Sequence, residues 1–299
     1  MILIIAVSYG GSPNIPAYLA SLQRQDVSDW HLIVVNNSGD PFEARELRRM
    51  TSTDQRVAVL EPGANLGYFG AIRWALKEAE WLAPWLIISN TDVEVLSTDA
   101  FSRLERIHQE TNVPPAVVAP SITSRRTGRD QNPLMERRPR LSELRRRRFM
   151  LASPTVAQLA ILGSAARRRL PQLGRPAPTA SGGREIYAPH GSFMAIHQSY
   201  FAGGGDLEYP LFLFGEESYV ADQCWRAGLR VLYVPGIMVA HLEHQQTRLL
   251  RPRHLLRLSG AAAKYAYDAF FADSLDDNHP RRSAGYFRYL PGASQADDS

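Results

Sequence analysis

Three short polar clusters follow apolar runs in the first third of this 299-residue chain. They are Ser8-Tyr9, Asn36 to Asp40, and Asn90-Thr91-Asp92. Each apolar run has the length and composition of a parallel strand that is covered on both faces. Ligands of open parallel sheets bind beyond the carboxyl ends of the strands, where these clusters would lie. The edge of the predicted sheet is therefore suited to a nucleotide.

Two common ways of holding a nucleotide are missing from the sequence. The first apolar run is followed by Gly10-Gly11-Ser12-Pro13, which does not match the G-x-G-x-x-G fingerprint of dinucleotide-binding folds. The chain contains no P-loop either. The site is therefore not built in the manner of a dehydrogenase or an ATPase.

The elements that position these clusters can be read from the apolar periodicity. Strands are predicted at 3–7, 31–35, 57–60 and 85–89, with helices at 15–22, 42–50 and 68–82 between them. This β-α-β-α-β-α-β order implies a doubly wound, mainly parallel sheet of the α/β class. Further on, a strand is predicted at 116–119, a helix at 217–227 that stops at Gly228, and a strand at 230–234.

Seven segments, taken in chain order, carry a resemblance to a known family. They are Val34 to Ser38, Asn65 to Gly70, Ser89 to Val93, His190 to Met194, Phe212 to Glu217, Arg226 to Tyr233, and Val239 to His241. Their order and spacing resemble family 2 glycosyltransferases of the rhamnosyltransferase-like branch. The resemblance implies the GT-A fold, a Rossmann-like, mainly parallel central sheet flanked by helices. It also implies sugar transfer, of the hexosyl or deoxyhexosyl type, in polysaccharide biosynthesis of the cell envelope.

The resemblance sets the expected domain organisation. A GT-A glycosyltransferase domain is expected over 1–247, with a basic insertion at about 121–185 that holds one or two helices. An amphipathic helical extension and a polar tail are expected over 248–299. The last residues of the tail have the composition of a disordered segment.

The resemblance also implies a metal site. The family has an Asp-x-Asp motif at the end of the fourth strand, and here Asn90 replaces its first carboxylate, so Asp92 is the expected ligand. A divalent ion, Mg2+ or Mn2+, would neutralise the donor diphosphate as the sugar bond breaks. The family places a further ligand at His241, with His244 as an alternative. The competing interpretations are a turn or helix-capping role for Asp92 and a structural role for the histidine.

A catalytic base is implied at the start of the helix predicted at 217–227. Glu216-Glu217 occupies the position of a Glu-Asp pair in the family, whose second member accepts the proton of the acceptor hydroxyl. Glu217 is the first choice and Glu216 the second, because adjacent residues at a helix start cannot point at one spot. Tyr219 stands where many relatives carry another Asp, which affects the choice of acceptor.

Eleven residues are predicted to contact the nucleotide sugar. Asparagines at these positions are equally suited to ordinary turns, and a glycine before a helix to backbone needs, so structural roles stay open for them. The set is Ser8, Tyr9, Asn36, Asn37, Asp40, Asn65, Gly67, Asn90, Asp92, His190 and Gly191.

Charge is spread unevenly along a chain with a net charge of only +4. Ten arginines and a single acidic residue, Glu143, lie between Arg137 and Arg169. Together with the Arg- and aromatic-containing segment 249–271, this block predicts contact with an anionic membrane. A solvated loop and a surface helix packed on the domain are the alternatives. No nucleic-acid-binding motif accompanies the basic run, so nucleic acid is not an expected partner.

Bulk composition fits a globular protein of the cell interior. The chain is 44% apolar and 21% charged, and its one cysteine, Cys224, cannot form an intramolecular disulfide. Neither a signal peptide nor a run long enough to span a membrane is recognised. A cytoplasmic location is predicted, with peripheral contact at the inner face of the cell membrane as an open possibility.

The sequence thus predicts an inverting, metal-assisted glycosyltransferase that uses a nucleoside-diphosphate sugar and a glycan or lipid-linked acceptor. One alternative is a nucleotidyltransferase that makes such donors, although Gly10 to Pro13 has no Lys or Arg beside it. The other is a non-catalytic scaffold that binds sugar nucleotides, which Asn90 and Tyr219 favour.

Overall fold

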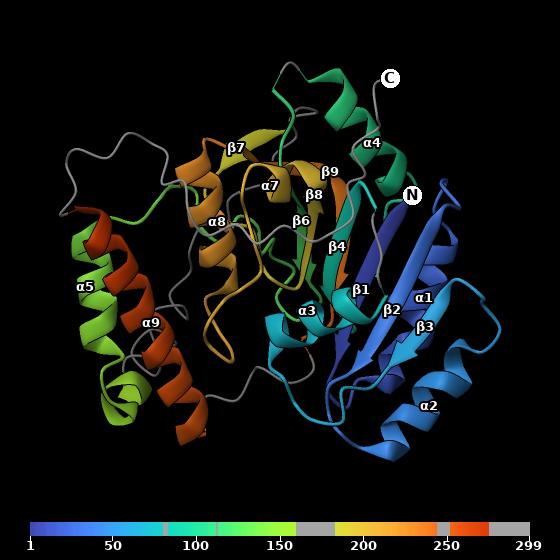
Figure 1. The fold of residues 1–299 in the computed structure, drawn as a ribbon, viewed down its shortest axis with the longest axis horizontal. Coiled ribbons are helices and arrows are strands. Elements are labelled where there is room, and N and C mark those ends of the chain that lie inside the picture. The colour runs from blue at the N-terminus through green and yellow to red at the C-terminus, as the bar shows by residue number, and fades with distance from the viewer. Residues whose placement is uncertain (80–82, 112, 160–182, 244–251, 275–299) are drawn as a thin grey trace, which may run out of the picture.

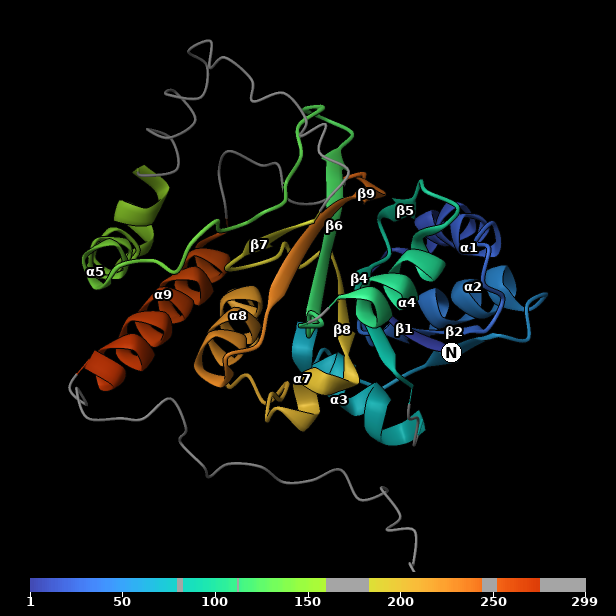
Figure 2. The ribbon, with the colours of Figure 1, turned by 90° about the horizontal axis from the view of Figure 1, so that it is seen from above.

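A mixed nine-stranded sheet forms the middle layer of the molecule, with helices on both faces (Figures 1 and 2). The structure is a computed structural model that describes residues 1–79, 83–111, 113–159, 183–243 and 252–274. The strand order is β3-β2-β1-β4-β8-β6-β9-β5, and β7 pairs with β9 outside this path.

The first half of the sheet is parallel, as the sequence predicts. It consists of β1 (Ile2–Ser8), β2 (Trp30–Asn36), β3 (Val57–Leu60) and β4 (Trp85–Asn90). The residues of β1 are nearly all buried, because the sheet is covered on both faces here. Their carboxyl ends therefore meet at one edge, with Ser8 opposite Asn36.

The second half of the sheet is mixed, which the sequence did not predict. It contains β5 (Val93–Val95), β6 (Val117–Ser124), β7 (Arg184–Ile186), β8 (Phe193–His197) and β9 (Val231–His241). The strand β8 runs antiparallel to both of its neighbours, β4 and β6. Its first residue, Phe193, therefore lies opposite Ser89, near the end of β4 and at the same edge as the parallel carboxyl ends.

The strand β9 is longer than the predicted 230–234 because it continues beyond a bulge. The register of β6 against β9 shifts between Pro120 and Ser121, where the partner changes from Val234 to Met238. Such a bulge absorbs the residues that cannot pair regularly, and the strand then resumes. The continuation carries His241 to the edge where the parallel strands end.

Two apolar clusters attach the helices to the two faces of the sheet. The helices α1 (Ile15–Gln23), α2 (Pro41–Thr51) and α4 (Ala100–Glu110) pack on one face, through Tyr18, Leu47 and Phe101. The helices α3 (Tyr68–Ala79), α7 (Gln198–Ala202) and α8 (Glu216–Ala227) cover the other face, through residues such as Phe69 and Val220. The molecule is thus a three-layer α/β/α structure.

A pair of helices extends this architecture beyond α8. The basic segment forms α5 (Leu141–Met150), and the carboxyl-terminal segment forms α9 (Arg253–Ser274). The two lie side by side at the end of the molecule opposite α1 and α2 (Figures 1 and 2). Arg148 of α5 pairs with Asp268 of α9 at 3.5 Å and its guanidinium lies over Tyr267. In the described part of the chain, no helix has both the length and the apolar character that a membrane crossing needs.

A stacked histidine pair lies at the other end of β8. The rings of His108 and His197 are 3.5 Å apart, and Trp85 packs edge-on against His197. His197 caps α7, where its Nδ1 accepts the backbone N–H of Ser199 at 3.1 Å. Burial and the charge of His108 lower the pKa of His197 to about 4. The pair is therefore held in its neutral form.

Candidate active site

The pairing of β5 with β9 brings Asp92 and His241 together. Asp92 directly precedes β5, and Val93 lies opposite His241 in the antiparallel ladder. The Nε2 atom of His241 is 3.4 Å from Oδ1 of Asp92. Both residues belong to the predicted metal site, and 149 positions separate them in the sequence.

A hydrogen-bond chain fixes the orientation of His241. Its Nδ1 lies 2.8 Å from Oε1 of Gln131, and Nε2 of Gln131 donates to Glu243 at 2.5 Å. The amide oxygen of Gln131 is thus the acceptor, so Nδ1 of His241 carries a hydrogen and Nε2 faces Asp92. Gln131 lies in no recognised motif, and sequence reasoning missed it.

The electrostatic surroundings keep Asp92 ionised. Burial acts to raise its pKa, but the hydrogen bond and charge of His241, together with the side chain of Asn90, outweigh it, and the pKa lies below the ordinary value. A carboxylate and an imidazole at this distance are a donor set that suits a divalent ion with several open positions. Among the described residues, no third His, Cys, Asp or Glu completes a metal cluster with them. His244, the alternative ligand, lies outside the described residues.

His190 joins this pair to the strand β8. Its ring lies edge-on to that of His241 with 5.8 Å between the centroids. The Nδ1 atom accepts the backbone N–H of Ser192 at 3.2 Å, and the backbone N–H of His190 donates to Asn132 at 2.7 Å. Burial and the charge of His241 lower the pKa of His190 to about 4, so the ring is neutral. Asn90 also connects the end of β4 to this loop, because its backbone N–H donates to the carbonyl of Ser192 at 3.0 Å.

Glu217 faces the residue next to His190. A Cβ atom built on Gly191 would lie only 2.6 Å from Oε1 of Glu217, so the carboxylate lies directly against this glycine. Tyr68, which sequence reasoning did not single out, donates its hydroxyl to the Gly191 carbonyl at 3.0 Å. The loop His190-Gly191-Ser192 thus connects the predicted base with the Asp92–His241 pair.

The two glutamates at the start of α8 have different surroundings. Glu216 is buried, and within the described residues its Oε1 has no hydrogen-bond partner. Burial and the charge of Glu217 raise the pKa of Glu216 to about 8. Burial also raises the pKa of Glu217, against hydrogen bonds from backbone groups that include Gly191. Because Glu217 contacts the loop that leads to Asp92, it is better placed for proton transfer than Glu216.

The loop before α8 is tightly constrained on the side of the predicted nucleotide contacts. Phe214 has φ +71°, which is rare for a bulky residue, and Tyr209 donates its hydroxyl to the Phe214 carbonyl at 2.6 Å. Gly67 has φ +75°, and a Cβ there would lie 2.1 Å from the carbonyl oxygen of Phe212. Gly67 therefore lets the segment before α3 pass close to the loop that carries Glu216 and Glu217.

Asn37 and Asn65 hold the segment before α3 in place. Asn37 donates to Oδ1 of Asn65 at 2.9 Å and to the Gly67 carbonyl at 3.1 Å, and it accepts the N–H of Leu66 at 2.8 Å. These contacts give Asn37 and Asn65 a role in loop shape. Their contact with a nucleotide sugar stays a prediction.

Asn36 and Asp40 close the turn after β2. Asn36 donates to the Asp40 carbonyl at 3.0 Å and accepts the hydroxyl of Ser38 at 2.6 Å. Asp40 caps α2 by accepting the N–H of Phe42 at 2.8 Å. The turn interpretation therefore has direct support for both residues, and their contact with the nucleobase of the donor stays a prediction.

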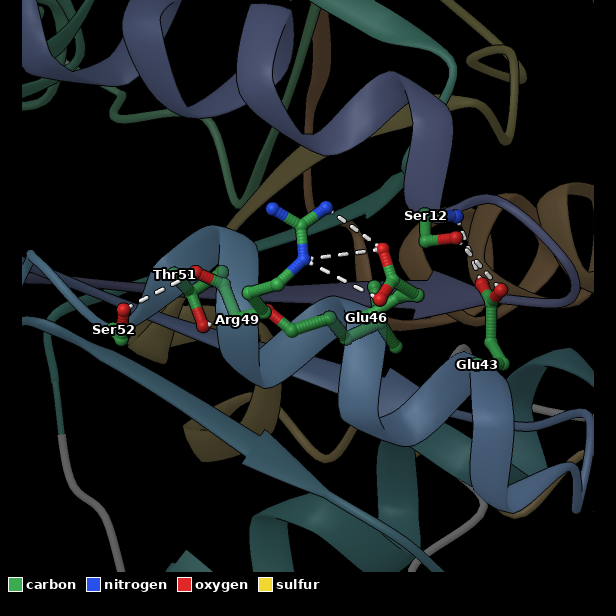
Figure 3. A network of polar contacts seen from close by, with 7 residues as sticks. Ser12, Glu43, Glu46, Arg49, Thr51 and Ser52 are labelled. Carbon is green, nitrogen blue, oxygen red and sulfur yellow. Dashed lines mark hydrogen bonds and ion pairs between the residues drawn. The ribbon is translucent and has the colours of Figure 1, made fainter.

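Ser8 is tied to a buried carboxylate that sequence reasoning missed. Glu43 of α2 accepts the Ser8 hydroxyl at 3.1 Å. It also accepts both the N–H and the hydroxyl of Ser12 at 2.8 Å (Figure 3). Figure 3 also shows the exposed pair Glu46–Arg49 one turn further along α2. Tyr9 is 59% exposed at the same edge. The turn after β1 is therefore held from α2, and Tyr9 is accessible to a ligand.

Comparison with known proteins decides the family. Residues 3–171, more than half of the chain, match the family described as glycosyl transferase family 2. The chain belongs to this family. The resemblance seen in the sequence is thereby confirmed, and family 2 membership selects glycosyl transfer over nucleotidyl transfer.

Curated and solved relatives of this family 2 protein agree with the assignment. The N-acetylglucosaminyl-diphospho-decaprenol L-rhamnosyltransferase of Mycobacterium tuberculosis (strain H37Rv) is 24% identical over 269 residues, which cover 82% of this chain and 76% of the relative. The structure of a mannosyltransferase from Pyrobaculum calidifontis with GDP-Man and Mn2+ has a TM-score of 0.55 at 15% identity, and GalNAc-T7 with UDP, GalNAc and Mn2+ has 0.58 at 14%. These alignments cover 93% and 95% of this chain, which spans only 65% and 53% of the two solved chains. The likeness establishes the GT-A fold.

Proposed function

We propose that this family 2 glycosyltransferase moves a sugar, with inversion, from a nucleoside-diphosphate sugar to a hydroxyl of a lipid-linked glycan. The observation that carries the proposal is the shared loop His190-Gly191-Ser192, which has Glu217 against it and Asp92 and His241 beside it. An ionised acid–imidazole pair and a separate carboxylate thus lie along one edge of the sheet. That arrangement suits a reaction with a diphosphate leaving group and a hydroxyl nucleophile.

Asp92 and His241 would hold the divalent ion, Mg2+ or Mn2+. When bound, such an ion neutralises the charge that develops on the departing diphosphate. Asp92 is suited to this role because His241 keeps it ionised in a buried position. The chain Gln131–Glu243 holds the imidazole with Nε2 directed toward Asp92. Two solved relatives contain Mn2+, which supports the ion class.

Glu217 would act as the general base. The acceptor oxygen attacks the anomeric carbon from the face opposite the diphosphate, the bond to the diphosphate oxygen breaks, and the hydroxyl proton passes to Glu217. A carboxylate whose pKa is raised by burial binds this proton better than a solvent-exposed one does.

The acceptor proposal rests on the curated relative and on α5. That relative is named for a diphospho-decaprenol acceptor, a sugar carried on a lipid. In this chain, Phe149 of α5 is 77% exposed beside the four arginines 145–148. A basic helix that exposes an aromatic residue suits an anionic membrane surface. We therefore include peripheral membrane contact, at the inner face, in the proposal.

Glu217→Gln tests the function, because glutamine keeps the size of the side chain but accepts no proton. The rate constant for transfer should fall by about 10²- to 10⁴-fold, the usual contribution of a general base. Donor binding should change less than about twofold, because the lost interaction develops in the transition state. The assay is release of nucleoside diphosphate that depends on an added acceptor.

Glu216→Gln is the matched control, since it alters the adjacent carboxyl without removing the proposed base. It should reduce the rate constant far less than Glu217→Gln does. A Glu217→Gln enzyme at nearly the wild-type rate would refute the assignment, and a large loss in Glu216→Gln alone would move the role to Glu216. A wild-type protein that binds donor but transfers to no acceptor would favour the scaffold alternative.

Membrane contact is tested by sedimentation with liposomes. The protein should bind vesicles that contain anionic lipid and leave them as salt rises, because exposed charges are screened. Arg145→Glu with Phe149→Ser should weaken this binding. Equal binding to neutral and anionic vesicles would reject the contact.

A further inference from the structure

A cavity of about 550 Å³ lies between α5 and the segment Met135–Pro139. It is lined on the α5 side by Glu143, Arg146, Arg147 and Met150. These positions are three or four residues apart, so they share one face of the helix. The opposite face of α5 carries Arg145 and the exposed Phe149, which do not line the cavity.

The lining carries positive charge that is not compensated within it. Of its two acidic residues, Glu143 pairs with Arg137 at 2.7 Å and Glu136 pairs with Arg184. Arg146 and Arg147 form no ion pair with any residue that the structure describes. Both arginines are exposed, so two guanidinium groups beside the cavity are available to an anion, and guanidinium is the side chain best matched to phosphate oxygens.

The rest of the lining is apolar. Met135, Leu144, Met150 and Leu151 complete the wall around the two arginines. A small hydrophilic anion gains nothing from such a wall, whereas a hydrocarbon chain does, because its burial removes apolar surface from water. The cavity therefore suits a molecule with an anionic head and an apolar chain.

The cavity also lies near the proposed base. Arg147 is close enough to Glu217 for its positive charge to oppose the effect of burial on the pKa of that carboxyl. It acts in the same way on the hydroxyl of Tyr209, which holds the loop before α8. Leu144 of the cavity wall also packs in one apolar cluster with Ala188, two residues before His190, and with Ala221, one turn after Glu217 in α8. A ligand bound at Arg147 would therefore lie on the side of the molecule that carries the proposed base.

From these observations we infer that this cavity binds the phosphate group of the lipid-linked acceptor, with Arg146 and Arg147 as its cationic partners. The inference rests on the proposed function and extends it by assigning a second anion site, separate from Asp92 and His241. The apolar wall would contact the first part of the lipid chain. The exposed Phe149 lies on the opposite face of α5 and marks the face that would contact the membrane.

Binding of farnesyl diphosphate to the full-length protein tests the inference without any transfer reaction. The titration is done in EDTA, so that a metal-dependent donor site does not capture the diphosphate. Farnesyl diphosphate should bind at least about tenfold more tightly than pyrophosphate or farnesol, because only it uses both the arginines and the apolar wall. Tighter or equal binding of pyrophosphate would show a free-phosphate site and overturn the lipid assignment.

Matched variants locate the bound probe. Arg146→Gln with Arg147→Gln should weaken farnesyl diphosphate binding by about tenfold or more, whereas Arg145→Gln, on the opposite face, should change it less than about twofold. Asp92→Ala should leave it unchanged. Equal binding by the Arg146/Arg147 double variant and the wild type would overturn the inference, and so would a loss in Asp92→Ala.

Kinetics then separate this inference from the proposed function. For an acceptor sugar on a lipid diphosphate, the double variant should raise KM by about tenfold or more, while its KM for the same sugar on a neutral alkyl chain should stay within about twofold. Equal losses for both acceptors would reject phosphate recognition. Probe binding that follows the prediction in a protein that transfers no sugar would reject the proposed function and leave the phosphate site standing.

Discussion

The close approach of Gly67 to Phe212 allows a quantitative prediction, because Gly63 in the same loop provides a control. Gly63 and Gly67 have nearly equal φ angles, +78° and +75°. A Cβ on Gly63 would meet no atom within 4 Å, whereas one on Gly67 would lie 2.1 Å from the Phe212 carbonyl oxygen. Alanine at each position therefore separates the conformational cost from the steric one.

The conformational cost is common to both variants. A Cβ in the left-handed region costs about 1–2 kcal/mol, and the reduced freedom of the unfolded chain returns about 0.4–1 kcal/mol. Gly63→Ala should thus lose about 1 kcal/mol of unfolding free energy or less. Gly67→Ala should lose about 1–3 kcal/mol more, the usual cost of overpacking a closed contact. Chemical denaturation monitored by circular dichroism measures both values.

The steric cost should also appear in the rate. To reach an ordinary contact of 3.4 Å, the Gly67 and Phe212 backbones must separate by about 1 Å. Phe212 lies five residues before Glu217, so the loop that carries the proposed base is displaced. A misplacement of about 1 Å can cost about 10²-fold in rate, and we expect that loss in Gly67→Ala but not in Gly63→Ala. Two variants with equal stabilities and equal rates would refute this reasoning.

Three further predictions concern other parts of the molecule. EDTA should abolish transfer, and Asp92→Ala should weaken Mn2+-dependent donor binding by about tenfold or more in calorimetry; full activity in EDTA would remove the metal. The pKa of His197 is about 4 in the folded state and about 6.5 in the unfolded state. The unfolded state therefore binds a proton first as the pH falls, and the stability present above pH 6.5 should be lost as the pH approaches 4. Because His197 is in partial contact with solvent, we expect a loss of about 1–2 kcal/mol. The variant His197→Asn, which keeps the helix cap, should lose less stability over this pH range than the wild type, and an equal loss in both would refute the assignment. Glu43→Gln should lower the unfolding free energy by about 1–3 kcal/mol, whereas Glu46→Gln in the exposed pair should leave it unchanged.

The parallel half of the fold could be predicted because its signals are local. The strands β1, β2 and β4 are buried on both faces and appear in the sequence as unbroken apolar runs, each ended by a polar cluster. The mixed half has weaker signals. The strands β5 and β7 have only three residues each, and Pro235-Gly236 within β9 looks like a turn that ends the strand. The pairings of β9 with β6 and β5 show that the strand continues.

Candidate site residues could be named from the sequence, but the contacts between them could not. Asp92 and His241 could be named from the family resemblance, yet their contact depends on an antiparallel pairing between strands far apart in the sequence. Gln131 and Glu43 have no motif at all, because each acts only through partners that folding brings near. Side-chain hydrogen bonds between distant segments leave no periodic signal in the sequence.

The reversed direction of β8 brings both ends of one long segment to the same place. The strand β6 ends with Ser124 opposite His241, and β8 begins beside the end of β4, so the segment between them starts and finishes at one edge of the sheet, and it pairs with β9 through β7 on the way. A segment with both ends anchored at one place can lengthen at little cost, since each doubling of a flexible loop adds only about 0.6 kcal/mol. Residues can therefore be added near α5 while Gln131 and His190, close to the two ends of the segment, keep their contacts with His241.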